Sequence, residues 1–333
     1  MSAPVVPSVR AEPEPLPENI PSIQPGGGWC YRVELAWGRL RRWHLKRFRP
    51  GYVRRMAELR QGDCQGAPWE VLDPRDLKFC RNRCTCAWDP AVDPFAWRER
   101  LPFARWGLAE LQLMGWPLLA LTVVFAYGSW RLGSAWLLAP GVVTAVVLGL
   151  VVWFFRDPPR RIPEGPGLVV SPADGKVAEV TRVEHDEYVG GPAVKIGIFL
   201  SIFNVHLNRS PAAARVIGLR YTPGEFLSAL KPECLTRNDA MWIGLEEEDP
   251  PHRRMVVRQI AGAYARRIVC ALRPGEVVGR GEKIGMIKLG SRTELIVPDA
   301  PGLVLEVRVG DRVRAGSRVL ARYPAQGPSG GID

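Results

Sequence analysis

The sequence lacks the features that would place it among secreted proteins. Its first 27 residues contain no apolar run of the kind that forms the core of a signal peptide. Its seven cysteines are an odd number, and five of them precede residue 87, whereas a secreted disulfide framework needs an even set. We therefore expect the soluble parts of the chain to lie in a reducing compartment.

The chain also has fewer acidic than basic residues. The chain has 45 Lys and Arg residues against 34 Asp and Glu, which gives a net charge of +11 and an isoelectric point near 9.6. Such an excess calls for an anionic partner, either nucleic acid or an acidic lipid surface. The long apolar segments described below favour the lipid surface, and we expect no nucleic acid partner.

The first third of the chain differs in composition from the rest. Residues 1–27 are rich in Pro and Glu and poor in large apolar residues, which predicts a disordered tail. Residues 28–107 form a basic extension rich in Trp and Cys, in which apolar residues from Trp37 onward recur at roughly helical spacing among the basic residues of positions 39–60. This pattern predicts a basic amphipathic helix that contacts anionic headgroups. A solvated cationic face packed on its own domain and a nucleic-acid surface are the alternatives.

The cysteines of this extension are candidate metal ligands. Cys80, Cys84 and Cys86 lie within seven residues, with Cys30 and Cys64 upstream. Thiolates at this density can bind zinc, although the spacing is not a standard C-x2-C pair. Reduced structural thiols and redox-active thiols explain the same pattern.

Two long apolar segments follow the extension. Residues 111–130 and 132–155 contain no charged residue and are separated only by Arg131. Each is long enough to cross about 30 Å of hydrocarbon as a helix. We therefore expect a transmembrane helical hairpin over residues 108–157, although a buried helical pair in a soluble core would also fit. Arginines flank both ends of the hairpin, so the positive-inside rule places both ends, and the domain that follows, on the cytoplasmic side of the cell (inner) membrane.

Residues 158–333 change to short β-type runs. Alternation of period two over residues 194–202 is typical of a strand, and helical signals are scarce. The fold class that we expect is a β-rich α+β catalytic domain preceded by the two-helix hairpin. Residues 301–323 resemble the hairpins of lipoyl- and biotinyl-type half-barrels.

The Gly290-Ser291 step has an unusual setting, since apolar, β-prone residues flank it on both sides. A bulge or turn is the ordinary explanation of glycine in such a place. The Gly290 carbonyl is also open to attack by the Ser291 hydroxyl, which gives an ester whose elimination breaks the chain and leaves a pyruvoyl group. This chemistry needs a base and an orienting carboxylate. His206, at the end of an apolar strand, and Asp174, in a Ser-Pro-Ala-Asp-Gly run, are the candidates; a buried core histidine and a turn aspartate are the ordinary alternatives.

Four motifs together resemble the phosphatidylserine decarboxylase family, in its short, Gly-Ser-Arg form. In chain order they are Ser171-Pro172-Ala173-Asp174-Gly175, Val205-His206-x-Asn208-Arg209-x-Pro211, Tyr221-x-Pro223-Gly224-x-Phe226 and Leu289-Gly290-Ser291. The segment Phe154-Phe155-Arg156-Asp157-Pro158, between the hairpin and the catalytic domain, adds to the likeness.

The resemblance implies a proenzyme that cleaves itself between Gly290 and Ser291 into a β chain, 1–290, and an α chain, 291–333. Ser291 would become the covalent pyruvoyl cofactor, and Asp174, His206 and Ser291 would match the family's self-processing triad. The substrate implied is phosphatidylserine in the bilayer and the product phosphatidylethanolamine; a homo-oligomer is compatible with this.

The chain departs from the family's pattern at two places. Phe203 stands where some members have a second histidine, and residues 228–231 and 237–240 differ from the family's Asn- and Lys-containing substrate segment. Three other functions stay open at this point: decarboxylation of archaetidylserine, a hydrolase that uses Ser291 unmodified, and a non-catalytic membrane-tethered lipid-binding domain.

Overall fold

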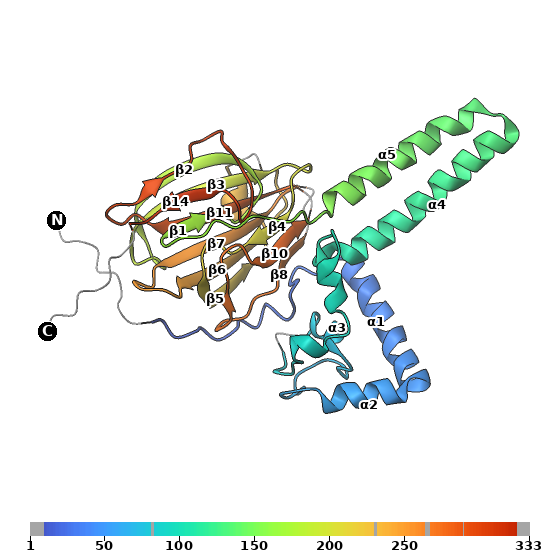
Figure 1. Cartoon of the computed structure of the whole chain (residues 1–333), viewed down its shortest axis with the longest axis horizontal. Helices are drawn as coiled ribbons and strands as arrows, with labels where there is room; N and C mark the ends of the chain where they lie inside the picture. Colours follow the sequence, from blue (N-terminus) through green and yellow to red (C-terminus); the bar gives the residue numbers. More distant parts are fainter. Residues whose placement is uncertain (1–9, 81–82, 230–231, 264–266, 289, 325–333) are drawn as a thin grey trace. The chain divides into compact units, whose positions relative to one another are not determined.

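The computed structural model describes residues 10–80, 83–229, 232–263, 267–288 and 290–324. The chain divides into two compact units (Figure 1). The helical unit consists of residues 27–80 and 84–158. The second unit consists of residues 1–26, 81–83 and 159–333, and we call its part from residue 159 onward the β domain.

The helical unit contains the basic extension and the two apolar helices. Its α-helices are α1 (Trp29–Phe48), α2 (Pro50–Glu58), α3 (Pro74–Leu77), α4 (Leu108–Leu132) and α5 (Leu138–Phe154). Short 3-10 helices link them: η1 (Pro90–Val92), η2 (Ala96–Arg100), η3 (Arg105–Gly107) and η4 (Ala135–Leu137). The amphipathic helix expected near Trp37 is therefore the longer α1.

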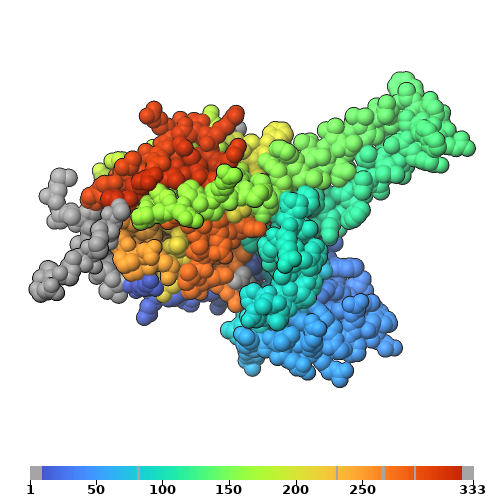
Figure 2. Space-filling model, in the orientation of Figure 1, coloured from blue at the N-terminus to red at the C-terminus, as the bar shows by residue number. Residues whose placement is uncertain are grey.

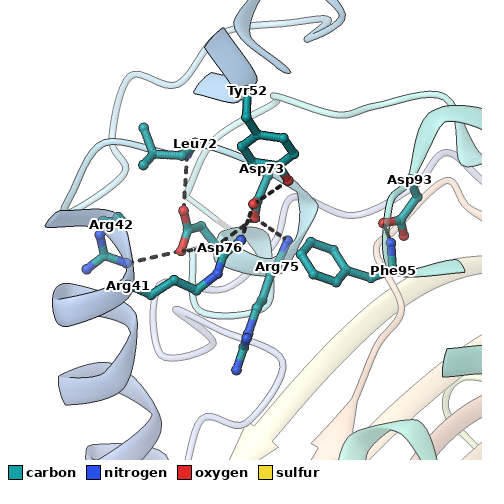
Figure 3. A network of polar contacts seen from close by, with 9 residues as sticks. All are labelled: Arg41, Arg42, Tyr52, Leu72, Asp73, Arg75, Asp76, Asp93 and Phe95. Atoms are coloured by element: carbon teal, nitrogen blue, oxygen red, sulfur yellow. Dashed lines mark hydrogen bonds and ion pairs between the residues drawn. The ribbon is translucent and has the colours of Figure 1, made fainter. Parts of the chain in front are cut away.

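A polar network fixes one face of α1 to the extension (Figure 3). Arg41 pairs with Asp73, and Arg42 donates to Asp76 over 3.1 Å. Tyr52 donates to the same Asp73 carboxylate over 2.8 Å. Both carboxylates are almost fully buried, and burial raises the pKa of Asp76. Because buried charges are retained only when paired, these contacts determine which face of α1 turns inward.

Helices α4 and α5 pack against each other as an antiparallel pair (Figure 1). The Thr122 hydroxyl donates to the Thr144 hydroxyl across the pair over 3.0 Å. Most of the remaining surface of the pair is apolar and exposed, including Trp116, Trp130 and Trp136 at 67%, 77% and 89%. By length and composition, Arg105–Leu132 and Ala135–Phe154 are each able to cross a membrane. A helical pair of a soluble core would bury these side chains.

The β domain is built from antiparallel strands with one short helix, α6 (Cys234–Arg237), among its described residues. The strands are β1 (Leu168–Val170), β2 (Gly175–Asp186), β3 (Gly191–Leu200), β4 (Leu207–Arg209), β5 (Ala214–Thr222), β6 (Ala240–Glu247), β7 (Arg254–Ala261), β8 (Arg267–Cys270), β9 (Val277–Val278), β10 (Lys283–Lys288), β11 (Ser291–Pro298), β12 (Val304–Leu305), β13 (Arg312–Val313) and β14 (Val319–Arg322). The expected β-rich class is confirmed.

One large curled sheet carries most of the core. Its strand order is β13-β2-β3-β11-β7-β6-β5-β9, and two three-stranded sheets, β4-β10-β8 and β1-β14-β12, complete the domain. The inward side chains of β3 and β11, such as Ile196, Ile198 and Leu295, are fully buried in one hydrophobic cluster. β12 and β14 pair antiparallel within residues 301–323, and their likeness to lipoyl-type hairpins stays a prediction.

Residues 10–26 differ from the disordered tail that composition predicts; residues 1–9 of that tail lie outside the described part. The segment runs along the β domain, where part of it shows in dark blue against the orange strands (Figure 2). Glu14 N–H donates to the Ile217 carbonyl over 2.7 Å, and Ile23 accepts from Cys270 N–H over 2.9 Å. Ile20 is only 2% exposed and belongs to the main core cluster. The buried side chains of Ile20 and Ile23, together with these two backbone hydrogen bonds, thus hold the segment on the β domain, although its average composition is polar.

We predict that Ile20→Ala destabilises the protein by about 2–5 kcal/mol, because it leaves a cavity in the main core. The measurement is thermal or denaturant unfolding of the full chain in detergent. Ile202→Ala is the matched control, since Ile202 is 46% exposed and should lose far less. Equal stability of the Ile20→Ala variant and the unchanged protein would show that the segment does not pack on the β domain.

Candidate active site

Ser291 begins the central strand β11 and is completely buried. Its backbone lies between Leu200 of β3 and Ala261 of β7 in the sheet register. Within the part of the chain that the structure describes, no group hydrogen-bonds to the Ser291 Oγ. A buried hydroxyl without a partner costs roughly 1–3 kcal/mol, and such groups deserve a functional explanation.

Gly290 precedes this strand in the left-handed conformation, with φ +58°. A Cβ at this position would meet no atom within 4 Å, so the backbone angle, not space, is what favours glycine here. The residue before it, Leu289, lies outside the described residues. The scissile bond of the sequence prediction therefore joins a glycine in a left-handed turn to the first residue of a buried strand.

His206 hydrogen-bonds to the residue on the N-terminal side of this bond. Its Nε2 accepts a hydrogen bond from the Gly290 N–H over 3.2 Å, and its Nδ1 lies 2.9 Å from the Asn204 carbonyl oxygen. Because a carbonyl oxygen only accepts, Nδ1 carries the proton and Nε2 presents its lone pair to Gly290. The imidazole is completely buried. The structure thus hydrogen-bonds His206 to Gly290, the residue that precedes Ser291 in the chain, and the self-processing role of these residues stays a prediction.

Asp174 accepts hydrogen bonds from two groups, and the orienting role expected for it stays a prediction. Its Oδ2 accepts from Arg160 over 2.8 Å, and its Oδ1 accepts from the Ala315 N–H over 2.7 Å. Its loop is nonetheless linked to the site, because the carbonyl of Pro172 accepts from Arg209 N–H, in the strand that follows His206. Both oxygens of Asp174 are therefore engaged with Arg160 and Ala315.

A buried amide cluster underlies the start of β11. The Asn208 amide donates to the Thr293 hydroxyl over 3.0 Å, and Gln259 donates to the Asn208 oxygen over 2.9 Å. All three side chains are completely buried. Thr293 lies two residues after Ser291, on the same face of the strand. Sequence reasoning missed Gln259 and Thr293; the available signal is a polar residue at an inward position of an otherwise apolar strand.

Gly262 lies against the carbonyl of the Gly290-Ser291 bond. A Cβ added at Gly262 would lie 2.3 Å from the Gly290 oxygen and 3.3 Å from the Ala229 Cβ. No side chain fits in that space without moving the Gly290 carbonyl. The sequence gives no hint of this contact, because it depends on the pairing of β7 with β11.

The candidate metal ligands of the extension lie in its hydrophobic core. Cys80, Cys84 and Cys86 are buried, and the sulfur atoms of Cys84 and Cys86 are 3.3 Å apart. Burial raises the pKa of Cys80 and Cys86, which disfavours the thiolate form that binds metals. Among the described residues, no group of three or more His, Cys, Asp or Glu has the geometry to hold a metal ion. These three buried cysteines belong to the hydrophobic cluster of the extension.

Comparison with known proteins adds to this geometry. The family model of phosphatidylserine decarboxylase matches residues 147–321. A phosphatidylserine decarboxylase proenzyme of Rhodopirellula baltica is 48% identical over 247 residues, which are 74% of this chain and 99% of that protein. Proenzymes of the same name from Symbiobacterium thermophilum and Carboxydothermus hydrogenoformans are 45% and 42% identical, and the matches cover 63% and 62% of this chain and 94% and 93% of theirs.

The match covers more than half of the chain and nearly all of these relatives. It includes Asp174, His206, Gly290 and Ser291, the residues around which the site is built. The chain belongs to the phosphatidylserine decarboxylase family.

Proposed function

We propose that this chain is a self-processing, pyruvoyl-dependent enzyme that converts phosphatidylserine to phosphatidylethanolamine at the cytoplasmic surface of the cell membrane. One observation carries the proposal. The buried Ser291 Oγ has no partner among the described residues, and the imidazole of His206 hydrogen-bonds to the residue on the other side of the same peptide bond. The relatives' names, phosphatidylserine decarboxylase proenzyme, support both the substrate and the processing.

Self-cleavage uses only groups of this chain and water. The Ser291 oxygen attacks the Gly290 carbonyl carbon, its proton passes to a base, and the C–N bond breaks to give an ester and a free amine. Loss of the Ser291 α-proton then expels the Gly290 carboxylate, and hydrolysis of the remaining enamine releases ammonia and leaves the pyruvoyl group. His206 is the base that we propose, since its Nε2 hydrogen-bonds to the N–H of Gly290, the residue whose carbonyl is attacked.

The residues present fit a pyruvoyl group at position 291, because the group is made from a side chain that is already buried beside an imidazole. The group supplies a ketone for the substrate amine and an electron sink for decarboxylation. What the protein itself contributes to the reaction follows from where residue 291 and His206 lie in the fold. The sheet excludes water from residue 291, and His206, once protonated at Nε2, is the donor that we propose for the return of a proton to the substrate carbon.

Membrane attachment suits a substrate that carries two acyl chains. Helices α4 and α5 are long and apolar enough to cross the bilayer. The chain from Phe154, the last residue of α5, to Arg160 is six residues long and spans at most about 20 Å. Arg160 pairs with Asp174. The covalent link between the proposed membrane anchor and the β domain is therefore short.

Intact-mass measurement of the purified protein tests the processing directly. We expect two chains that separate between residues 290 and 291, with a blocked N-terminus on the shorter one, and a single full-length chain for Ser291→Ala. Borohydride should abolish activity, because it reduces the pyruvoyl ketone. A full-length wild-type chain would refute the proposal, and activity that resists borohydride would favour a hydrolase with an unmodified serine.

We predict that Gly262→Ala slows self-cleavage on the order of a hundredfold, because the added methyl group displaces the Gly290 carbonyl from its position beside Ser291. Gel analysis of maturation over time measures the effect. Gly279→Ala is the matched control in the same domain, since a Cβ there would lie 3.6 Å from its nearest atom, in ordinary contact. Cleavage of the Gly262→Ala variant at the rate of the control would contradict this prediction.

We also propose that α1 lies in the headgroup region of an anionic bilayer. The helix has two different faces. Gly38, Arg42 and Leu45 are buried inside the extension, whereas a separate stripe of large apolar side chains is exposed. The stripe consists of Trp29, Val33, Trp37, Leu40, Trp43 and Phe48, which are 37–62% exposed. Exposed arginines, including Arg32, Arg39 and Arg47, lie on the same helix. Exposed aromatics among basic residues are typical of interfacial helices.

Quenching of tryptophan fluorescence by brominated lipid tests the contact of α1 with the bilayer. With the full chain in vesicles of brominated anionic lipid, replacing Trp29, Trp37 and Trp43 by Phe should lower the quenchable part of the emission, because these rings would lie at the depth of the quencher. The control replaces Trp88, which is 8% exposed, and Trp242 of β6. An equal change in both variants would show that α1 does not contact the lipid.

A further inference from the structure

The turn between β3 and β4 exposes two adjacent large apolar side chains. Ile202 is 46% exposed and Phe203 is 58% exposed. The other large apolar residues with such exposure in the described β domain are single valines, Val277, Val304 and Val309. Single exposed apolar residues are ordinary on protein surfaces. A neighbouring pair at the tip of one turn is a different feature, which we call the apolar tip.

Hydrogen bonds within the turn give the apolar tip a defined shape. The Asn204 side-chain oxygen accepts from both the backbone N–H and the hydroxyl of Ser201, over 2.9 and 2.8 Å. The Asn204 N–H donates back to the Ser201 carbonyl over 2.9 Å. Residues 202 and 203 lie inside this closed loop, so these hydrogen bonds define the backbone that carries the two exposed side chains.

The same turn is connected to the active site. The carbonyl oxygen of Asn204 accepts a hydrogen bond from Nδ1–H of His206, and Nε2 of His206 accepts a hydrogen bond from the Gly290 N–H. One residue therefore closes the turn that carries the apolar tip and fixes the tautomer of the imidazole. The backbone of the turn and the ring of His206 are joined by a single hydrogen bond.

We propose that the apolar tip inserts into the phosphatidylserine-bearing bilayer beside the site and positions His206 and residue 291 at the level of the lipid headgroup. The inference rests on the proposed function and adds to it the way in which the site meets its substrate. A lipid headgroup is bound to acyl chains that stay in the bilayer, so the site needs an apolar contact next to its polar groups. The apolar tip lies one hydrogen bond from the catalytic imidazole and is the feature that offers such a contact.

The test compares two substrates on the same reconstituted protein. One is long-chain phosphatidylserine within the vesicle, and the other is dihexanoyl-phosphatidylserine added as a monomer to vesicles of phosphatidylcholine. In the variant with both Ile202→Ser and Phe203→Ser, the ratio of vesicle to monomer activity should fall on the order of tenfold or more, because the apolar contact is lost. Val309→Ser, at a position 61% exposed, should keep the wild-type ratio.

Self-cleavage of each variant, measured on a gel, verifies that the site has formed before activity is compared. A double variant that matures and keeps the wild-type ratio would overturn the proposal. If the wild-type chain fails to cleave or to decarboxylate either substrate, the proposed function is wrong, and a second measurement decides the role of the apolar tip.

That second measurement does not depend on activity. The photoreactive residue benzoylphenylalanine replaces Phe203 in one protein and Val309 in another, both reconstituted in vesicles that contain phosphatidylserine. Irradiation should give a lipid adduct, detected by mass, at position 203 and about tenfold less at position 309, since only the inserted residue contacts acyl chains. Equal adducts at the two positions, or none at 203, would overturn the proposal.

Discussion

The antiparallel pairing of β11 with β3 and β7 is the constraint on which the site depends. This pairing buries Ser291 at the first position of a central strand. Gly290 absorbs the change of direction through its positive φ. A hydroxyl placed in this way costs free energy, because water cannot reach it. The apolar face that continues along the strand, with Leu295 and Val297 in the main core, offsets that cost, so the fold can hold the Ser291 hydroxyl in an unfavourable setting.

Local signals in the sequence predicted part of this site. Apolar runs on both sides of Gly290-Ser291 predicted a buried strand, and the structure has one in β11. Gln259 and Gly262 could not be found in this way, since their closeness to the site comes from strand pairing between distant segments. The packing of residues 10–26 could not be found from the sequence for the same reason. Average composition describes a polar chain, but the burial of Ile20 depends on strands some 200 residues later in the sequence.

Asp174 shows how a motif residue can contribute without contacting the reacting bond. Its carboxylate pairs with Arg160, and both side chains are about nine-tenths buried. Removing one partner of a buried ion pair leaves an unpaired charge, which is costly. The pair thus fixes the loop whose Pro172 carbonyl accepts from Asn208 and Arg209. Asp174 holds the strand that carries the amide cluster beneath Ser291.

Three separate apolar surfaces share one proposed explanation. The pair α4 and α5, the outer stripe of α1 and the apolar tip at Ile202 and Phe203 each expose large side chains that a water-soluble protein would cover. They lie on segments with different secondary structure, so no single local cause accounts for all of them. We propose a bilayer as their common cause, because a lipid substrate requires an anchor, an interfacial contact and an entrance at the site. The hydrogen bond from His206 to Asn204 joins the last of these surfaces to the chemistry.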